Sequence, residues 1–221
     1  MTGTRVRALL ARYAVAWLYL AGFLLTGLVY VALPGPGRHT MLWWASTDVV
    51  NLHHHPVGCL ALSAFITNDN WYAWPLLIAL ALFGANQVLG NWRTAVVCAA
   101  AHVIGTLVSE GIVAYRVQHG RLPAGDNLIL DVGPSYVVVA AIMVALLYGS
   151  WWARAAAAAD LAILVFIGRI FAGLSTLQVA AVGHATALLV GAAGGGLLLW
   201  QRRRTPRTEP AVRLAEQFPQ P

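Results

Sequence analysis

Long apolar stretches, separated by short polar segments, run through most of the chain. The first extends from about Ala14 to Leu33. Its roughly twenty residues are enough for a helix rising about 1.5 Å per residue to cross a hydrocarbon core of about 30 Å. It is longer than the apolar core of a typical signal peptide, so we predict a retained first transmembrane helix. The helix-breaking cluster Pro34-Gly35-Pro36-Gly37 ends it.

Five further apolar stretches predict five more helices. The second is expected from Trp71 to Leu89, with Asn70 as its N-cap and Pro75 early enough to be tolerated. The others are expected at about 94–115, at 132–147, from the turn 148–154 to about 171, and at 178–200. The pattern therefore predicts an all-α membrane protein whose six transmembrane helices form one bundle.

A long loop, from about 35 to 70, separates the first two predicted helices. Trp43 and Trp44 within it are residue types that favour a membrane interface. The stretch Pro56–Thr67 is apolar, but its roughly twelve residues are too few to cross the hydrocarbon core. We interpret it as an interfacial or re-entrant piece, partly embedded in the membrane, whose backbone must be covered by protein.

The composition supports a membrane protein and excludes a soluble domain. Hydrophobic residues make up 59% of the chain and charged residues only 10%, against about 25% charged residues in a typical soluble domain. The net charge is +6, yet all 14 basic residues are arginines that lie almost entirely between apolar stretches. Because that distribution is a feature of membrane topology, we exclude nucleic acid as a partner.

The arginines also predict an orientation, since cytoplasmic segments of membrane proteins are enriched in basic residues. The side that is richer in arginine includes both chain ends, so both termini are predicted to be cytoplasmic and the 35–70 loop to face outward. On that side lie Arg5, Arg7, Arg12, Arg93, Arg154, Arg202, Arg203, Arg204, Arg207 and Arg213, and on the other Arg38, Arg116, Arg121 and Arg169.

No polar linker is long enough to divide the chain into two domains. We predict a cytoplasmic N-terminal segment at 1–13, a membrane domain at 14–200, and a disordered cytoplasmic tail rich in arginine and proline at 201–221. The expected location is a plasma membrane, which the chain crosses several times. Cys59 and Cys98 both lie in apolar stretches, where buried free thiols are expected.

Few ionisable or nucleophilic side chains lie within the predicted helices, and each is a functional candidate because its burial in a membrane costs free energy. Ser135 falls in the first turn of the fourth helix, and His184 lies about 9–10 Å along the sixth. Both helices enter from the outer side, so the two side chains are expected at a similar depth. A histidine in that position can take the proton of a serine nucleophile. Alternatively, both side chains only pack and form hydrogen bonds between helices.

Small residues follow His184 at intervals of four. Ala187, Gly191 and Gly195 share one helix face, which lets a neighbouring helix approach closely. His184 lies on about the same face. The pattern favours a histidine held against a tightly packed helix, although ordinary close packing explains it as well.

The remaining polar candidates favour structural roles. Glu110 is expected to pair with Arg116 or to form a hydrogen bond inside the bundle, and Asp160 to face the bundle interior. The triplet His53-His54-His55 does not direct three rings to one centre and has no Asp, Glu or Cys at a ligand spacing. No metal and no organic cofactor are therefore predicted.

The order of these features resembles that of the rhomboid intramembrane serine proteases. That family has six helices, a long outer loop after the first, Gly-x-Ser-Gly at the start of the fourth and a catalytic histidine on the sixth. Here Gly133-Pro134-Ser135-Tyr136 stands at the Gly-x-Ser-Gly position, and His184, Ala187 and Gly191 match the sixth helix. The turn 86–90 resembles the one after the second helix. The resemblance covers about residues 12–200.

Two departures from the family concern the groups around the serine. Rhomboids usually carry His-x-x-x-Asn near the outer end of the second helix to hold the oxyanion, and the positions near Asn70 and Trp74 lack that pair. Asn70, Asn68, Gly133 and Tyr136 are the candidates for this support. Tyr136 also replaces the glycine after the serine. Its ring would widen the contact between the fourth and sixth helices unless it turns toward the loop or stacks on the imidazole.

The resemblance implies a divergent, bacterial, rhomboid-like protein of the inner membrane. Its first implied function is hydrolysis of peptide bonds in transmembrane protein substrates by a Ser135/His184 dyad. The alternative is an inactive relative, a pseudoprotease, that binds or chaperones client transmembrane helices. A small transporter is disfavoured, because few polar groups lie deep in the predicted bundle.

Overall fold

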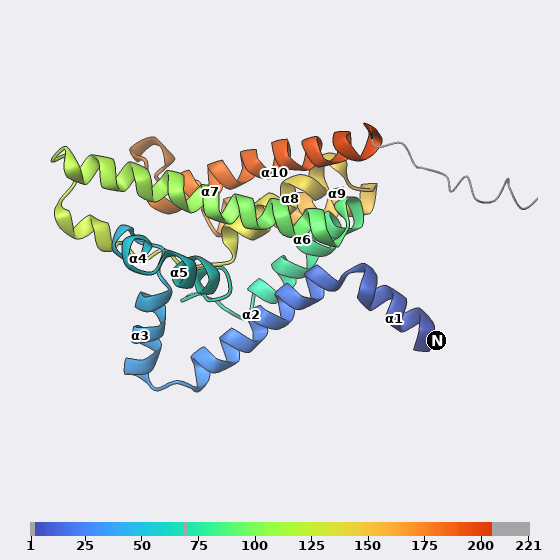
Figure 1. Cartoon of the computed structure of the whole chain (residues 1–221), viewed down its shortest axis with the longest axis horizontal. Helices are drawn as coiled ribbons and strands as arrows, with labels where there is room; N and C mark the ends of the chain where they lie inside the picture. Colours follow the sequence, from blue (N-terminus) through green and yellow to red (C-terminus); the bar gives the residue numbers. More distant parts are fainter. Residues whose placement is uncertain (1–2, 69, 205–221) are drawn as a thin grey trace, which may run out of the picture.

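The structure, a computed structural model, describes residues 3–68 and 70–204, and within them every regular element is a helix (Figure 1). The prediction of an all-α fold is confirmed. The elements are α1 Gly3–Arg12, α2 Ala14–Ala32, α3 Gly35–Ala45, α4 Val49–His54, α5 Pro56–Ser63, α6 Trp74–Leu89, α7 Asn91–Gln118, η1 Ala124–Leu128, α8 Ser135–Tyr148, α9 Trp151–Ala162, η2 Ile163–Ile167, η3 Leu174–Thr176 and α10 Val179–Arg204.

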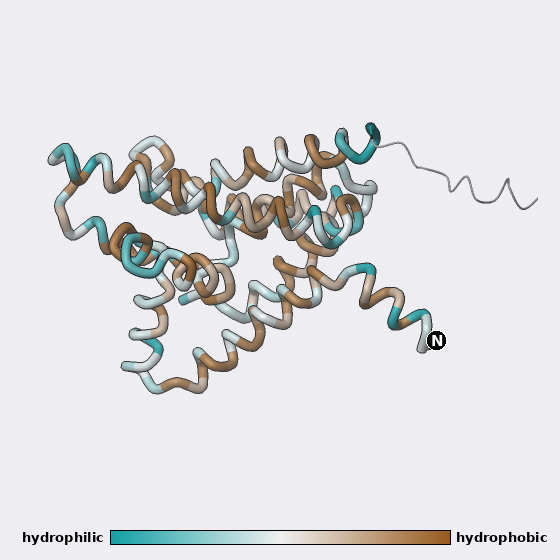
Figure 2. Tube along the Cα trace, in the orientation of Figure 1, coloured by the Kyte–Doolittle hydropathy of each residue, from teal (hydrophilic) through white to brown (hydrophobic). Residues whose placement is uncertain are grey.

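Three of these helices, α2, α7 and α10, are long and apolar enough to cross a membrane, judged by length and composition. Helices α6 and α8 are apolar but shorter. Brown, apolar residues predominate along the long helices, whereas hydrophilic residues gather toward the ends of the molecule (Figure 2). Together these helices define a multi-pass integral membrane protein.

Helix α8 is the centre of the bundle. Nearly every side chain from Tyr136 to Ala145 is buried, as expected for a helix that is apolar on all sides. It packs against α6, α7, α9 and α10, and α10 packs in turn against α7. Alanine and valine predominate in this stretch, and their small volumes allow close helix contacts.

The observed helix ends differ from the predicted ones where glycine and proline intervene. Helix α8 begins at Ser135 instead of 132, because Gly133 has a φ of 154° and Pro134 disfavours helical backbone in the residue before it. Helix α6 begins at Trp74, and its N-cap is Ala73, not Asn70. The fifth helix ends as a π-helical turn, η2, followed by irregular backbone around Arg169, where φ is 50°.

The segment between α5 and α6 enters the bundle, and other parts of the chain satisfy its backbone. The carbonyls of Ala64 and Phe65 accept hydrogen bonds from the hydroxyls of Tyr19 and Thr26 on α2. The carbonyl of Ser63 accepts one from the N–H of Gly133, at 3.0 Å. Three consecutive carbonyls at the end of this short apolar stretch are thus satisfied by other parts of the chain.

Helix α10 extends to Arg204, so residues 201–204 of the predicted tail are helical. The rest of that tail, 205–221, lies outside the described residues. Helix α1 and the C-terminal end of α10 lie at the same end of the molecule (Figure 1).

Candidate serine–histidine site

The N-terminal halves of α8 and α10 lie in close contact because α10 presents small residues. The position of a Cβ on Gly191 would be only 2.7 Å from the Cα of Ala140, and on Gly195 it would be 3.0 Å from Val144. Ala187 is fully buried between these positions and His184. On α8, therefore, the face that meets α10 is the one that carries Tyr136, Ala140 and Val144.

His184 is held in one tautomer. The side chain is 6% exposed, and its Nδ1 lies 2.8 Å from the carbonyl oxygen of Ile170, in the irregular segment after η2. A carbonyl only accepts, so Nδ1 carries the proton and Nε2 keeps its lone pair. Nε2 is buried without a hydrogen-bond partner. Leaving a buried polar atom unpaired costs about 1–3 kcal/mol, a cost that is offset if this nitrogen accepts a proton in a reaction.

Ser135 is the first residue of α8, within the helix turn where it was predicted. It is not hydrogen-bonded to His184, because Nδ1 of that histidine is bonded to Ile170 and Nε2 has no partner. Helix geometry explains this. Successive residues are about 100° apart around a helix, and Tyr136, not Ser135, lies on the face toward α10. The side chain of Ser135 is half-buried beside the Gly133 turn.

Tyr136 fills the space between α7, α8 and α10. Its ring stands edge-on to the imidazole of His184, with centroids 5.2 Å apart and planes at 81°. Its hydroxyl donates to Oδ2 of Asp131 in the preceding loop, at 3.2 Å. The ring fits because Gly183 and Gly105 leave it room: a Cβ on Gly183 would overlap the ring, and one on Gly105 would lie 3.3 Å from it. Tyr136 thus turns toward the loop and also contacts the imidazole.

The two asparagines proposed to support an oxyanion lie elsewhere. Asn68 and Asn70 are both exposed. Asn70 has a φ of 36°, and its side-chain oxygen accepts a hydrogen bond from the hydroxyl of Tyr72. The neighbouring Trp71 packs near Gly27 of α2. These contacts keep Asn70 beside α2, and no hydrogen bond among the described residues connects either asparagine to Ser135.

His102, a buried residue in the middle of α7, was not singled out by the sequence analysis. Its Nε2 lies 3.0 Å from the carbonyl of Leu60 and 3.1 Å from Oγ of Ser63. The carbonyl fixes the proton on Nε2, so His102 donates to the end of α5 and holds that segment in the bundle. The sequence did carry an indication, since a histidine within an apolar span is itself a candidate.

The other polar candidates have separate surroundings. Glu110 is 2% exposed and neither carboxylate oxygen has a hydrogen-bond partner. The expectation that it pairs with Arg116 or bonds within the bundle is wrong, because the Arg116 guanidinium extends instead to the carbonyl of Thr176, at 2.9 Å. Asp160 is fully buried on α9 and faces the interior, as predicted.

The histidine triplet and the cysteines form no common centre. His54 contacts the carbonyl of Val50, and His55 that of Trp44, through separate hydrogen bonds. Cys59 and Cys98 are both buried as free thiols. Within the described residues, no group of three His, Cys, Asp or Glu side chains is arranged to hold a metal ion.

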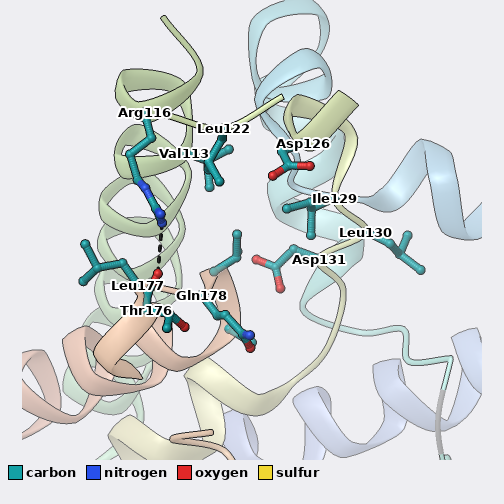
Figure 3. Close-up of a pocket in the computed structure, with 12 residues that line it drawn as sticks. Val113, Arg116, Leu122, Asp126, Ile129, Leu130, Asp131, Thr176, Leu177 and Gln178 are labelled. Carbon is teal, nitrogen blue, oxygen red and sulfur yellow. Dashed lines mark hydrogen bonds between the residues drawn. The ribbon is translucent and has the colours of Figure 1, made fainter. Parts of the chain in front are cut away.

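A cavity of about 490 Å³ opens between the C-terminal end of α7, the 122–131 loop and the start of α10 (Figure 3). We call it the Asp131 cavity. The carboxylates of Asp126 and Asp131 both face it, and Arg116 lines the opposite wall. Burial raises the pKa of Asp131, and the nearby Asp48 raises it further, although hydrogen bonds from Tyr136 and Thr47 act in the opposite direction. The cavity adjoins the serine–histidine site through Tyr136.

The fold and this site define an all-helical integral membrane protein with a histidine that is buried where two helices meet and has one unpaired ring nitrogen. The rhomboid-like protein family model matches residues 9–204, and the chain therefore belongs to the rhomboid-like family. No curated protein and no solved structure shows a significant match.

Proposed function

We propose that the protein is an intramembrane serine protease that hydrolyses peptide bonds of other membrane proteins. Six spans are assigned to α2, α6, α7, α8, α9 with η2, and α10, with the arginine-rich chain ends in the cytoplasm. Ser135 and His184 then lie toward the outer side of the membrane, below the loop that contains α3 to α5. Membership of the rhomboid-like family supports this assignment.

The observation that carries the proposal is the state of His184. The carbonyl of Ile170 holds the proton on Nδ1, while Nε2 is buried and unpaired. A neutral imidazole with a free lone pair is the form that a general base requires. His102 also keeps one ring nitrogen buried and unpaired, so the position of His184, beside the first turn of α8 that carries Ser135, is what sets it apart as the base.

In the proposed reaction, Oγ of Ser135 attacks the scissile carbonyl carbon while Nε2 of His184 takes the hydroxyl proton. His184 then gives that proton to the leaving amine, and the acyl group remains on Ser135. A water molecule, deprotonated by the same nitrogen, releases the acyl group as a carboxylic acid. No organic cofactor or metal takes part in these steps.

This chemistry requires Ser135 to approach His184 when substrate binds, since the two are not hydrogen-bonded in the free protein. Such contacts often tighten only in the complex. The oxyanion would be stabilised by backbone N–H groups at the start of α8, which have no partners within the helix. Gly133 has the extended backbone that precedes these groups in the turn into α8. Asn68, Asn70 and the Tyr136 hydroxyl remain further candidate donors.

A second function is supported by the position of Tyr136. Its ring occupies the α10-facing place on α8 and contacts His184, while the side chain of Ser135 does not. In this alternative the protein is a pseudoprotease that binds client transmembrane helices without cleaving them.

Labelling with a fluorophosphonate probe distinguishes these two functions, because the probe reacts with activated serines. The full chain is tested in nanodiscs, with Ser135→Ala and His184→Ala variants and with Ser63→Ala as the matched control, since Ser63 is the serine hydrogen-bonded to the other buried histidine. Proteolysis is supported if the probe labels the unmodified protein and the Ser63→Ala control but labels neither Ser135→Ala nor His184→Ala. Absence of labelling in the unmodified protein, or labelling that persists in Ser135→Ala, rejects it.

A further inference from the structure

The Asp131 cavity gathers negative charge with little compensation. Asp126 and Asp131 direct their carboxylates into it from the 122–131 loop (Figure 3). Among residues 3–68 and 70–204, Arg116 is the one cation that lines it, and its guanidinium donates a hydrogen bond to the carbonyl of Thr176. The amide of Gln178 adds a neutral polar group at the base. With all three charged groups ionised, the two carboxylates and one guanidinium give the lining a net negative charge.

A third acidic residue is buried beside the cavity. Glu110 lies one turn below Val113 on the same face of α7, and Val113 lines the cavity. Its carboxylate is 98% buried, lacks any hydrogen-bond partner and interacts electrostatically with Asp131 and Asp48. Buried acidic groups are normally paired with a cation or fully hydrogen-bonded. Glu110 is not part of the cavity lining, but a cation bound beside Asp131 would interact favourably with its ionised form.

The cavity also lies close to the proposed reaction centre. Val179 lines it and begins α10, and His184 follows five residues later, about 7.5 Å along the helix. Asp131 is bonded to Tyr136, whose ring contacts His184. A residue bound in the cavity would thus lie within a few residues of a peptide bond placed at His184.

We propose that the Asp131 cavity binds a lysine or arginine side chain in the juxtamembrane segment of a substrate, held by Asp126 and Asp131. This assignment rests on the proposed function. The expected substrates are membrane proteins with a basic residue on the outer side of their transmembrane helix. A cavity of about 490 Å³ has ample room for one such side chain. A cation also relieves the repulsion among the carboxylates around Asp131.

Binding, not cleavage, tests this site, so its outcome is separate from that of the proposed reaction. The full-length Ser135→Ala variant, in phosphatidylcholine nanodiscs, is titrated with fluorescent single-span peptides that carry either lysine or glutamate at the outer end. We expect the lysine peptide to bind about ten-fold more tightly. Replacing both Asp126 and Asp131 by asparagine should remove the preference, and Asp126→Lys should reverse it. Asp160→Asn, a buried acid outside the cavity, is the control that should retain it.

Two results overturn the assignment. One is equal binding of the lysine and glutamate peptides, including failure of both to bind. The other is a lysine preference that survives the double asparagine variant. Because Asp126 lies in a half-exposed turn, Asp126→Lys is expected to fold even if changes at Asp131 disturb Tyr136.

Helix α1 supports a second, independent inference. None of its residues is buried, and Val6, Leu9 and Leu10 expose 42%, 47% and 48% of their surface on one face. The helix has three arginines and no acidic residue. Arg5 and Arg12 flank the apolar face on one side and Arg7 flanks it on the other, at about 100° per residue. Apolar faces bordered by arginine are typical of helices that lie in a membrane interface.

The junction with α2 fixes α1 at an angle to the bundle (Figure 1). The side-chain amide of Asn86 donates to the carbonyl of Arg12, and that of Asn91 to the carbonyl of Ala11, both at 2.8 Å. Helix α2, which follows directly, is long and apolar enough to cross the membrane. The C-terminal end of α1 therefore lies at the edge of the bilayer.

From these contacts we infer that α1 lies in the membrane interface and binds the anionic lipid surface around α2. Nitroxide labels at Val6→Cys and Ala8→Cys, about 160° apart around the helix, report its immersion in full-length protein whose native cysteines are replaced by alanine. In nanodiscs containing phosphatidylglycerol, we expect the label at 6 to collide with oxygen and the label at 8 with a water-soluble nickel complex.

The contrast should weaken in pure phosphatidylcholine, and also when Arg5 and Arg7 are replaced by glutamine. Equal accessibility of both labels to the nickel complex would show that α1 projects into water, which overturns the inference. A contrast that is the same with and without anionic lipid overturns the charge-dependent part of it.

Discussion

Replacing Gly183 by alanine tests whether Tyr136 is locked between α7 and α10. A Cβ at this position would overlap the tyrosine ring, and Gly105 of α7 also packs close to the ring, since a Cβ built on Gly105 would lie 3.3 Å from it. Overpacking of this kind typically costs about 1–3 kcal/mol. Alanine also favours a helix over glycine by up to about 1 kcal/mol, so the measured loss is the difference between these effects.

Gly111→Ala on α7 is the matched control, because a Cβ there would meet no atom within 4 Å. It should leave stability unchanged or raise it slightly. Stability is measured by reversible unfolding in mixed detergent micelles, followed by helical circular dichroism. We expect Gly183→Ala to be less stable than Gly111→Ala by about 1–3 kcal/mol.

A double-mutant cycle with Tyr136→Ala then assigns the strain to the ring. Tyr136→Ala alone should destabilise by about 3 kcal/mol or more, as for other large buried aromatic side chains. In its presence, Gly183→Ala should cost little, so the two changes would be non-additive by 1 kcal/mol or more. Additivity to within about 0.5 kcal/mol would refute the argument that Gly183 exists to accommodate Tyr136.

Three further outcomes are expected. Thr26→Val should lower stability by about 0.5–1.5 kcal/mol, measured by the same unfolding assay, because it leaves the Phe65 carbonyl without its hydroxyl donor. Gly191→Leu should abolish fluorophosphonate labelling and lower stability, because the added side chain would meet the backbone of Ala140. The preference for the lysine peptide should be lost on acidification, at a higher pH than for an aspartate with an ordinary pKa. The reason is that burial raises the pKa of Asp131, and only the ionised carboxylate, which is present above that pKa, binds a cation. The charged and titratable groups around Asp131 are Asp48, Glu110, Arg116, Asp126 and Tyr136. Asp131→Asn should make the binding profile flatter, and an unchanged midpoint in that variant would refute the assignment to Asp131.

The helices were predicted best where an apolar stretch is long enough that a membrane-spanning helix is the one structure that fits it. The first predicted helix, Ala14 to Leu33, differs from α2 by one residue at its end. The start of α8 was placed three residues too early, although Pro134 in the sequence already argued against helical backbone before it. The local sequence thus determines where helices form, and the errors of the prediction lie at the helix ends.

The contacts of the site depend on packing that the sequence does not specify. Of the two possibilities raised for Tyr136, the turn toward the loop occurs, because its hydroxyl reaches Asp131. Stacking on the imidazole does not occur, because the ring meets that of His184 edge-on. The partner of Nδ1 of His184, the carbonyl of Ile170, belongs to an irregular segment that was predicted to be helical. His102 was missed because its role depends on Leu60 and Ser63, which are distant in sequence.

Tyr136 also explains how this chain differs from rhomboids in which glycine follows the serine. In that arrangement the small residue lies on the fourth helix, and the sixth helix approaches it. Here the large residue lies on α8, and the space is provided by Gly183 on α10 and Gly105 on α7. The close approach of α8 and α10 is therefore kept one turn further along, at Ala140 and Gly191. Because the tyrosine hydroxyl is bonded to Asp131, a cation that binds this carboxylate competes for its oxygens. Under the proposed function, substrate binding in the Asp131 cavity would thereby loosen the ring that contacts His184.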